Sequence, residues 1–286
     1  MSGSSAVQLL LVPYDSGRFD ERMGAGPRAL MAAGAARTLR ERGHTVTEKE
    51  LEPESDWRSE LRTAFELHRI LSRETSDARR SGVLPVVLAG NCNASVGVLA
   101  GLTGSGRRVG LVWMDAHGDF NTPDQDGAGF LDGQGLAMAV GRCWQAATSR
   151  IPGFRPLAEQ DVLLIGARDL TDDQRTELID SELTLCGRDA VAVEDALRSL
   201  AGRADVVHLH IDLDVYDPSV GRANEYAAPG GLLADEVLDI VTLATGILPI
   251  GSATIASYDP SFDPDGAISS AAVQLLGVIA DGAQSG

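Results

Sequence analysis

The chain has 286 residues, 44% of them hydrophobic, with 32 glycines and 12 prolines, a composition that is ordinary for a folded soluble protein. Its formal net charge of -17 argues against nucleic acid and anionic membrane as partners, because both attract basic surfaces. A cation-binding enzyme is compatible with that charge.

The cysteines and the first residues bear on the cellular compartment. Cys92, Cys143 and Cys186 are too few and too scattered for a disulfide framework, and we expect Cys143 and Cys186 to be buried as small apolar residues. The opening segment MSGSSAVQLLLVPYD lacks the basic start of a secretory signal, and its apolar run is too short to cross a bilayer. We therefore expect a cytoplasmic protein, and the Ala-, Gly- and Arg-rich composition points to a GC-rich bacterial genome.

Short apolar runs alternate with helical patterns along the chain. We expect strands over residues 7–12, 45–51, 84–89, 109–114, 161–165, 183–185, 206–213 and 249–256. We expect helices over residues 27–42, 57–81, 94–103, 135–145, 172–180, 194–200, 235–245 and 267–280, with His68 on the surface of the second. Such alternation predicts a mostly parallel sheet with helices on both faces. Because no internal repeat or linker is visible, we expect one three-layer α/β/α domain of about eight strands over residues 1–286.

Polar residues follow three of these strands. Gly90, Asn91 and Cys92 follow the strand over 84–89, and groups of aspartate and histidine follow the strands over 109–114 and 206–213. In an open α/β sheet, the binding site lies beyond the carboxyl ends of the strands. All three groups fall where that rule places a site.

The segment VGLVWMDAHGDFNTP carries the first group of aspartates. Its apolar strand ends in Asp115, His117 and Asp119. Successive side chains of a strand alternate between faces, so residues two apart point the same way. These three side chains should therefore converge, as a metal site requires.

The segment VVHLHIDLDVYDPS carries the second group. Asp212 and Asp214 again share a strand face, and His208 and His210 lie in the same register upstream, as core residues or as groups that orient the aspartates. Several acidic side chains that converge would repel one another unless cations neutralised them. Two divalent ions that share bridging carboxylates would meet this need.

These motifs resemble those of the arginase and agmatinase family, the ureohydrolases. DAHGD followed by NTP, and HIDLDVYDP, resemble the two metal motifs of that family. PYDSG, GAGP, IGARD and a late YDP resemble further landmarks in the family's order, so the resemblance covers nearly the whole chain. It implies an arginase-like fold, manganese as the usual metal and, in many members, a homo-oligomer.

The family's remaining metal ligand is a histidine in a GGDHS segment, where this chain has AGNCNASVGVLAG. Alignment without a gap places Cys92 at the histidine, whereas a shift by one residue places Asn93 there. We prefer Cys92, because a thiolate is a competent metal ligand and a carboxamide is a weak one. A buried structural role and a catalytic role are the alternatives for this thiol.

The resemblance implies two sets of ligands that share a pair of bridging aspartates. One ion would be held by Cys92, Asp115, Asp119 and Asp212. The other would be held by His117, Asp115, Asp212 and Asp214. Carboxylate-rich sites suit Mn2+, while the sulfur of Cys92 also admits Zn2+ or Fe2+.

The implied reaction is metal-assisted hydrolysis of a C–N bond in a small guanidino or amidino compound. Two ions lower the pKa of a bridging water, and the resulting hydroxide attacks the planar carbon of the substrate. Asp119 would hold the hydroxide by a hydrogen bond besides binding metal.

The expected substrate pocket departs from that of arginase. LDGQ places Asp132 where arginase-like enzymes carry a proton-shuttling histidine, so Asp132 is either an acid, if burial raises its pKa, or the cap of a loop. Ser257 of ASYDP takes the place of the glutamate that anchors the guanidinium, and a hydroxyl cannot replace a bidentate carboxylate. In the amino-acid clamp Asn121 is retained, but Ala128 and Phe130 replace a serine and an asparagine.

We therefore do not expect plain arginine to be the substrate. An N-hydroxyguanidine such as N-hydroxyarginine is less basic and needs a charged anchor less, and family members that act on hydroxyarginine also carry cysteine in the GGDHS region. Formimino or other amidino compounds are the alternatives. Glu225 and Tyr226 are candidate pocket residues, with a plain surface position as the alternative.

Two other classes of function stay open. The lost histidine and glutamate would suit a catalytically silent, metal-binding regulatory protein, although the intact aspartates and His117 count against it. Cys92 would suit a zinc amidohydrolase or deacylase on a related fold.

Overall fold

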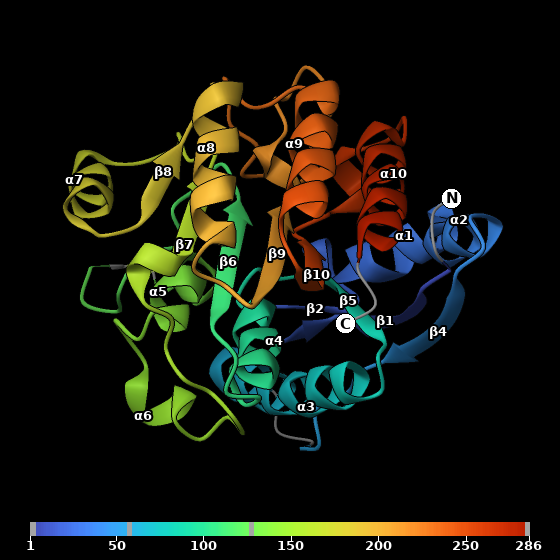
Figure 1. Cartoon of the computed structure of the whole chain (residues 1–286), viewed down its shortest axis with the longest axis horizontal. Coiled ribbons are helices and arrows are strands. Elements are labelled where there is room, and N and C mark those ends of the chain that lie inside the picture. Colours follow the sequence, from blue (N-terminus) through green and yellow to red (C-terminus); the bar gives the residue numbers. More distant parts are fainter. Residues whose placement is uncertain (1–3, 56–58, 126–128, 284–286) are drawn as a thin grey trace.

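Eight strands form one sheet at the centre of the protein, which the computed structural model describes over residues 4–55, 59–125 and 129–283 (Figure 1). In spatial order they are β4 (Thr45–Glu50), β1 (Ala6–Val12), β5 (Leu84–Ala89), β10 (Ile250–Ala256), β9 (Val206–Asp212), β6 (Val109–Met114), β7 (Val162–Ile165) and β8 (Thr184–Cys186). All neighbours in this sheet pair in parallel. The expected α/β architecture with about eight strands is confirmed.

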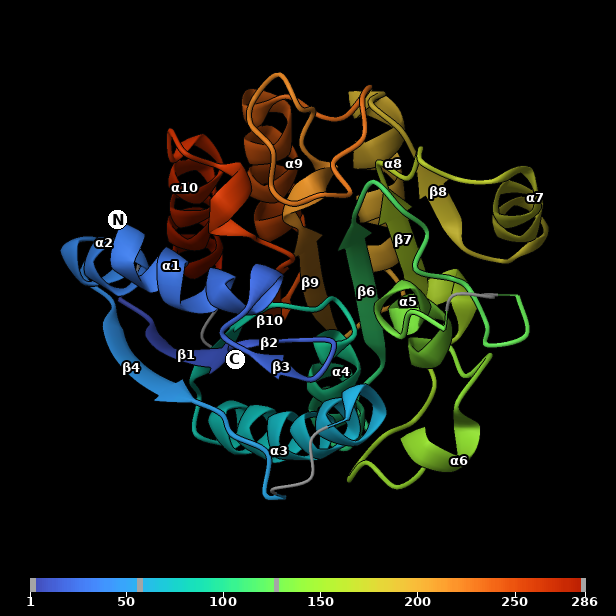
Figure 2. The same ribbon diagram turned by 180° about the vertical axis from the view of Figure 1, so that it is seen from behind.

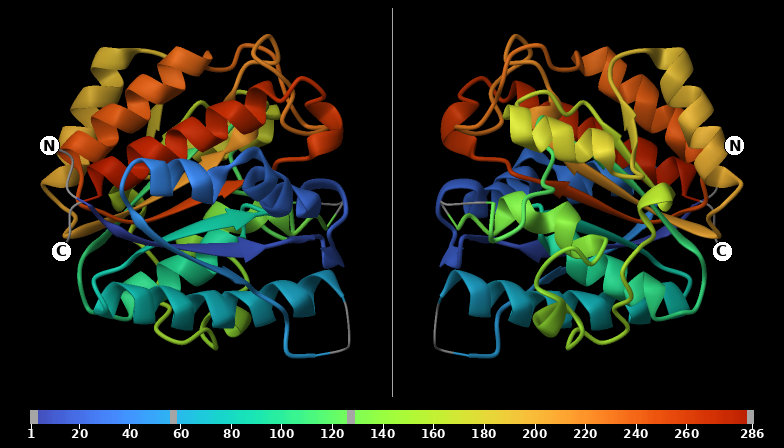
Figure 3. Two further views of the ribbon diagram at one scale, coloured as in Figure 1. Left: turned by 90° about the vertical axis from the view of Figure 1, so that its right-hand side faces the viewer. Right: turned by 90° about the vertical axis from the view of Figure 1, so that its left-hand side faces the viewer.

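Helices cover both faces of the sheet, which gives three layers (Figures 2 and 3). One face packs against α1 (Gly26–Ala33), α2 (Ala35–Glu41), α8 (Ala190–Ala201), α9 (Ala234–Ile247) and α10 (Ala267–Gly282). The other face packs against α3 (Glu60–Arg80), α4 (Ala94–Thr103) and α5 (Gly135–Ala139). The short α6 (Gln145–Thr148) and α7 (Asp172–Asp180) lie toward the side of β7 and β8, and a hairpin of β2 (Tyr14–Asp15) and β3 (Arg18–Phe19) follows β1.

The burial of each strand follows from its place in the sheet. Every residue of β5, β6, β9 and β10 is buried, because these central strands are covered on both faces. The edge strand β4 has the sequence TVTEKE, and most of its side chains are exposed. Charged residues on an edge strand discourage pairing with other chains.

Several helices differ from the expected ranges. The helix expected over 27–42 is two helices, because Gly34 adopts a left-handed φ of 110° between them. The helix expected over 135–145 ends at Ala139 and is followed by Gly141 with a φ of 81°. The helix expected from residue 57 begins at Glu60, with Ser59 as its cap, and Trp57 lies outside the described residues.

Cys143 and Cys186 differ in burial. Cys143 is buried as expected, whereas Cys186 is half-buried because β8 is an edge strand. Over the described residues, no helix is both long and apolar enough to cross a membrane.

The strand order decides where the polar clusters meet. β5, β10, β9 and β6 are consecutive neighbours, and all point the same way. The segments that follow their carboxyl ends therefore converge at one edge of the sheet. Gly90 permits close approach there, since a Cβ at this position would lie 2.3 Å from the carbonyl oxygen of Tyr14.

Candidate metal centre

The segments after β5, β6, β9 and β10 meet at one cavity. The predicted site residues that line it are Cys92, His117, Asp119, Asn121, Phe130, Asp132, Asp212, Asp214, Tyr226 and Ser257. Asp115 lies beside them and is fully buried. Motifs that are far apart in the chain are thus side by side in the structure.

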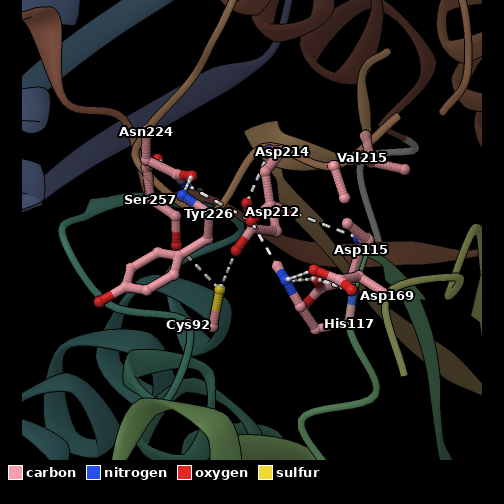
Figure 4. Close-up of polar contacts among 12 residues, drawn as sticks. Cys92, Asp115, His117, Asp169, Asp212, Asp214, Val215, Asn224, Tyr226 and Ser257 are labelled. Carbon is pink, nitrogen blue, oxygen red and sulfur yellow. Dashed lines mark hydrogen bonds and ion pairs between the residues drawn. The ribbon is translucent and has the colours of Figure 1, made fainter. Parts of the chain in front are cut away.

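His117 lies between two buried carboxylates (Figure 4). Its Nδ1 is 3.3 Å from Asp115 Oδ1 and 3.3 Å from Asp214 Oδ2. The backbone supports this arrangement, because the N–H of His117 donates to Asp115 Oδ1 at 2.7 Å and the N–H of Ala116 donates to Asp214 Oδ1 at 3.2 Å. Burial alone would lower the pKa of His117, but the two carboxylates outweigh it and raise that pKa to about 12.

Cys92 faces the other end of the same cluster (Figure 4). Its Sγ donates to Asp212 Oδ2 at 2.9 Å and lies 3.2 Å from Ser257 Oγ. Burial, and then the charge of Asp212, raise the pKa of this thiol well above its ordinary value. Cys92 is thus a buried thiol that would ionise beside a cation.

The buried carboxylates repel one another. Burial and the charge of Asp214 raise the pKa of Asp115, and they raise the pKa of Asp212 well above its ordinary value. Burial and the charge of Asp115 do the same for Asp119. Burial would also raise the pKa of Asp214, but its hydrogen bond with His117 outweighs this and lowers it. Divalent cations would relieve this repulsion, and the oxygen, nitrogen and sulfur donors fit Mn2+, Zn2+ or Fe2+.

Two site residues adopt a backbone conformation that is rare outside glycine. Asp119 has a φ of 47° and Ser257 has a φ of 64°. The carbonyl of Asp119 accepts hydrogen bonds from the N–H groups of Leu136 and Ala137, at 2.9 and 3.1 Å, and Asn224 Nδ2 donates to the carbonyl of Ser257 at 2.8 Å. These contacts hold a strained backbone that turns both side chains toward the cavity, as is common at functional sites.

Asp132 is buried and accepts several hydrogen bonds. Asn91 Nδ2 donates to its Oδ2 at 2.8 Å, and the backbone N–H and Nδ2 of Asn93 donate to its Oδ1 at 2.8 and 3.0 Å. Burial nevertheless raises the pKa of Asp132 to about 7. The carboxyl group therefore meets the condition set for an acid, and it also fixes the residues on either side of Cys92.

The remaining predicted pocket residues surround the mouth of the cavity. The rings of Phe130 and Tyr226 lie 5.7 Å apart, and Asn121 Oδ1 accepts a hydrogen bond from Gln174 Nε2 at 3.0 Å. Ala128 lies outside the described residues. Glu225 is not among the described residues that line the cavity: its half-exposed carboxylate pairs with Arg22, which also donates to Tyr226 Oη at 3.1 Å. The position of Glu225 supports the alternative of a plain surface residue. Glu225 could affect the substrate only through Arg22 or Tyr226.

The histidines other than His117 are all buried. The expectation of a surface position for His68 is wrong, because α3 turns it toward α4, where its Nε2 lies 2.9 Å from Asn93 Oδ1. His208 and His210 are core residues on β9, and their hydrogen-bond partners are serine and threonine hydroxyls. Burial lowers the pKa of His68 to about 4 and that of His208 to about 3.

Sequence reasoning missed several residues of the site. Asn224 lines the cavity and its Nδ2 lies 3.4 Å from Asp214 Oδ2, although only its neighbours Glu225 and Tyr226 were expected in the pocket. Asp169, whose Oδ2 is 3.6 Å from His117 Nε2, ends the IGARD segment and could have been found by the same strand-end rule. Gln174, at the first turn of α7, carries no recognisable signal.

Comparison with known proteins identifies the family. The Arginase family model matches residues 5–280. The arginase of Bacillus caldovelox is 27% identical over 289 residues, which cover 95% of this chain and 96% of that protein. The crystal structure of arginase from Bacillus cereus has a TM-score of 0.87 at 23% identity and covers 96% of this chain and 98% of its own. That of formimidoylglutamase from Bacillus subtilis has a TM-score of 0.76 at 15% identity, over 99% of this chain and 88% of its own, which shows the same fold.

The family match spans nearly the whole chain, and it agrees with the motifs, the strand order and the cluster of buried donors at the sheet edge. The chain therefore belongs to the arginase family and is a metal-dependent amidinohydrolase that acts on a C–N bond.

Proposed function

We propose that the protein hydrolyses a C–N bond of a modified guanidine, with N-hydroxyarginine favoured over arginine. The observation that carries this proposal is Ser257. Its hydroxyl lies in the cavity, 3.2 Å from Cys92 Sγ. The sequence resemblance aligns Ser257 with the family's guanidinium-anchoring glutamate. A neutral hydroxyl can accept a hydrogen bond from a less basic hydroxyguanidine, but it cannot form the bidentate ion pair that a guanidinium favours.

The proposed metal ligands are those expected from the sequence. Cys92, Asp115, Asp119 and Asp212 would hold one ion. His117, Asp115, Asp212 and Asp214 would hold the other. The short distances from His117 to Asp115 and Asp214, and from Cys92 to Asp212, support both sets. Mn2+ is the favoured metal because carboxylates predominate, and when bound it would supply a hydroxide nucleophile by acidifying water near neutral pH.

The side chains around the proposed ions have separate roles in the proposal. Asp119 would hold the attacking hydroxide by a hydrogen bond and orient it toward the planar carbon. Asp132, whose pKa lies at about 7, would deliver a proton to the departing amine. Asn121, Phe130 and Tyr226 would contact the rest of the substrate at the mouth of the cavity.

A panel assay with the manganese-loaded protein tests the proposal. Arginine, N-hydroxyarginine, agmatine and a formimino amino acid are each supplied, and urea, hydroxyurea or ammonia release is measured with and without a chelator. We expect metal-dependent release of hydroxyurea from N-hydroxyarginine. Metal-dependent turnover of the formimino compound alone would instead support an amidino substrate, and no turnover of any compound by protein that contains metal would contradict the proposal.

A further inference from the structure

One buried nitrogen close to the proposed centre has no hydrogen-bond partner. His210, on β9, is fully buried, and among the described residues its Nε2 makes no hydrogen bond. An unpaired polar atom in a dry interior costs free energy, so such an atom calls for an explanation. A ring nitrogen of His210, the Sγ of Cys92 and a carboxylate oxygen of Asp115 all lie within 4.8 Å of one another.

The surroundings of His210 favour a free lone pair on Nε2. Ser95 Oγ lies 2.8 Å from His210 Nδ1 and 3.1 Å from His208 Nε2. His208 Nδ1 in turn lies 2.8 Å from Ser252 Oγ. Thr254 Oγ1 also lies 3.3 Å from His208 Nε2. One assignment that fits these distances has His208 donating from Nδ1 to Ser252 and accepting at Nε2, and His210 donating from Nδ1 to Ser95. This tautomer leaves Nε2 as an acceptor.

Trp113 positions the histidine and the aspartate together. Its ring stacks on that of His210 with the centroids 3.7 Å apart, and its Nε1 donates to Asp115 Oδ2 at 2.9 Å. A histidine that binds metal usually donates its other ring N–H to an oxygen that fixes the tautomer. His210 has this support from Ser95.

We propose that His210 is a metal ligand, which together with Cys92 and Asp115 forms a site for a borderline-soft divalent ion such as Zn2+. The inference rests on the proposed function, because it assigns a further ligand to the ion on the Cys92 side of that centre. His210 supplies from β9 the imidazole that the segment after β5 lacks, where cysteine replaces the family's histidine. With His210, this ion would have one sulfur and one nitrogen donor beside its carboxylates, a donor set that admits Zn2+ as well as Mn2+.

Titration of the whole protein with Co2+ tests the inference. A thiolate bound to Co2+ gives a charge-transfer absorption, so the band reports only the site that contains Cys92, and the C92S variant should lack it. We expect His210→Gln to weaken the Co2+ affinity measured from this band by at least about tenfold. The matched control is His44→Gln, which changes a buried histidine away from the cavity whose two ring nitrogens contact Ser5 and Asp281. The control should leave the affinity unchanged, because His44 has no contact with the network of Ser95, His208 and His210.

Each outcome of the titration decides between the claims. An unchanged affinity in His210→Gln, or an equal loss in both histidine variants, would overturn the role of His210 while leaving the proposed hydrolase intact. Failure of the wild-type protein to bind any divalent ion would overturn both proposals.

A second measurement keeps the inference testable if His210→Gln does not fold. In the His117→Asn variant loaded with one equivalent of Zn2+, X-ray absorption at the zinc edge should detect both sulfur and imidazole scattering, because His210 would be the imidazole that remains beside the thiol. Sulfur scattering without imidazole scattering, or no sulfur scattering, would contradict the proposed site.

Discussion

Asn93 donates two hydrogen bonds to Asp132 Oδ1, one from its backbone N–H at 2.8 Å and one from Nδ2 at 3.0 Å. Asn91 donates to the other oxygen of the same carboxyl group at 2.8 Å. Asp132 thus accepts hydrogen bonds from the asparagines on either side of Cys92. The resemblance marks Asp132 and both asparagines as departures from the family's sequence pattern. Asp132 therefore has a structural role besides its proposed role as an acid.

Replacing Asp132 with alanine should destabilise the fold. The change leaves the buried donors of Asn91 and Asn93 without their acceptor, and we expect a loss of about 1–3 kcal/mol in the free energy of unfolding. Urea denaturation measures it, with Asp124→Ala, an exposed aspartate of the same loop, as the control. Equal unfolding midpoints for the two variants would show that the network does not stabilise the fold.

The buried His68 should make the stability depend on pH. Its pKa is lowered from 6.5 to about 4 by burial, so the unfolded chain takes up a proton before the folded protein does. The contribution of neutral His68 to the free energy of unfolding is complete above about pH 6.5 and is lost as the pH falls toward about 4. Between about pH 7 and about pH 5, the free energy of unfolding should fall by about 2 kcal/mol. In urea denaturation, His68→Gln should show a correspondingly smaller loss over this range, and parallel curves for the two proteins would contradict the assignment.

The Asp119→Asn variant tests the proposed catalytic carboxylate. Asparagine tolerates the left-handed φ of 47° and keeps the size of the side chain, but it removes the negative charge. We expect kcat to fall by at least about a hundredfold with an unchanged circular dichroism spectrum. A variant that keeps wild-type turnover would rule out Asp119 as the group that orients the nucleophile.

Arg22 should affect substrate binding through the loop that carries Tyr226. Its guanidinium contacts Asp15, Glu225 and Tyr226. Arg22→Ala therefore removes the hydrogen bond to Tyr226, which lines the cavity. We expect KM to rise by roughly fivefold, equivalent to about 1 kcal/mol, with little change in kcat. Arg18→Ala is the control, because Arg18 is exposed and its ion pair is with the neighbouring Glu21. The same KM in both variants would argue against this role.

Periodicity and strand-end chemistry predicted the parallel sheet and the convergence of Asp115, His117 and Asp212. Both follow from local rules, since side-chain alternation and the direction of parallel strands need no knowledge of distant contacts. The order of the strands does not follow from them. That order places β10 between β5 and β9, and it brings Ser257 within 3.2 Å of Cys92 Sγ.

Other features depend on tertiary packing and could not be predicted from the sequence. His68 has the polarity of a surface residue, but α3 packs closely on α4 and buries it beside Asn93. The network of Asp132, Asn91 and Asn93 joins two loops that are far apart in the chain. Among the described residues, His210 Nδ1 contacts Ser95 while Nε2 has no hydrogen-bond partner, a difference that depends on the packing of α4 against β9.

The ratio of kcat/KM for N-hydroxyarginine to that for arginine tests the central claim most directly. It is measured with one preparation of manganese-loaded protein at about pH 7 to 8. Because Ser257 cannot form a bidentate ion pair with guanidinium, we predict a ratio of at least about ten, equivalent to about 1.4 kcal/mol of transition-state stabilisation. Turnover of arginine at an equal or higher kcat/KM would contradict the account of this pocket.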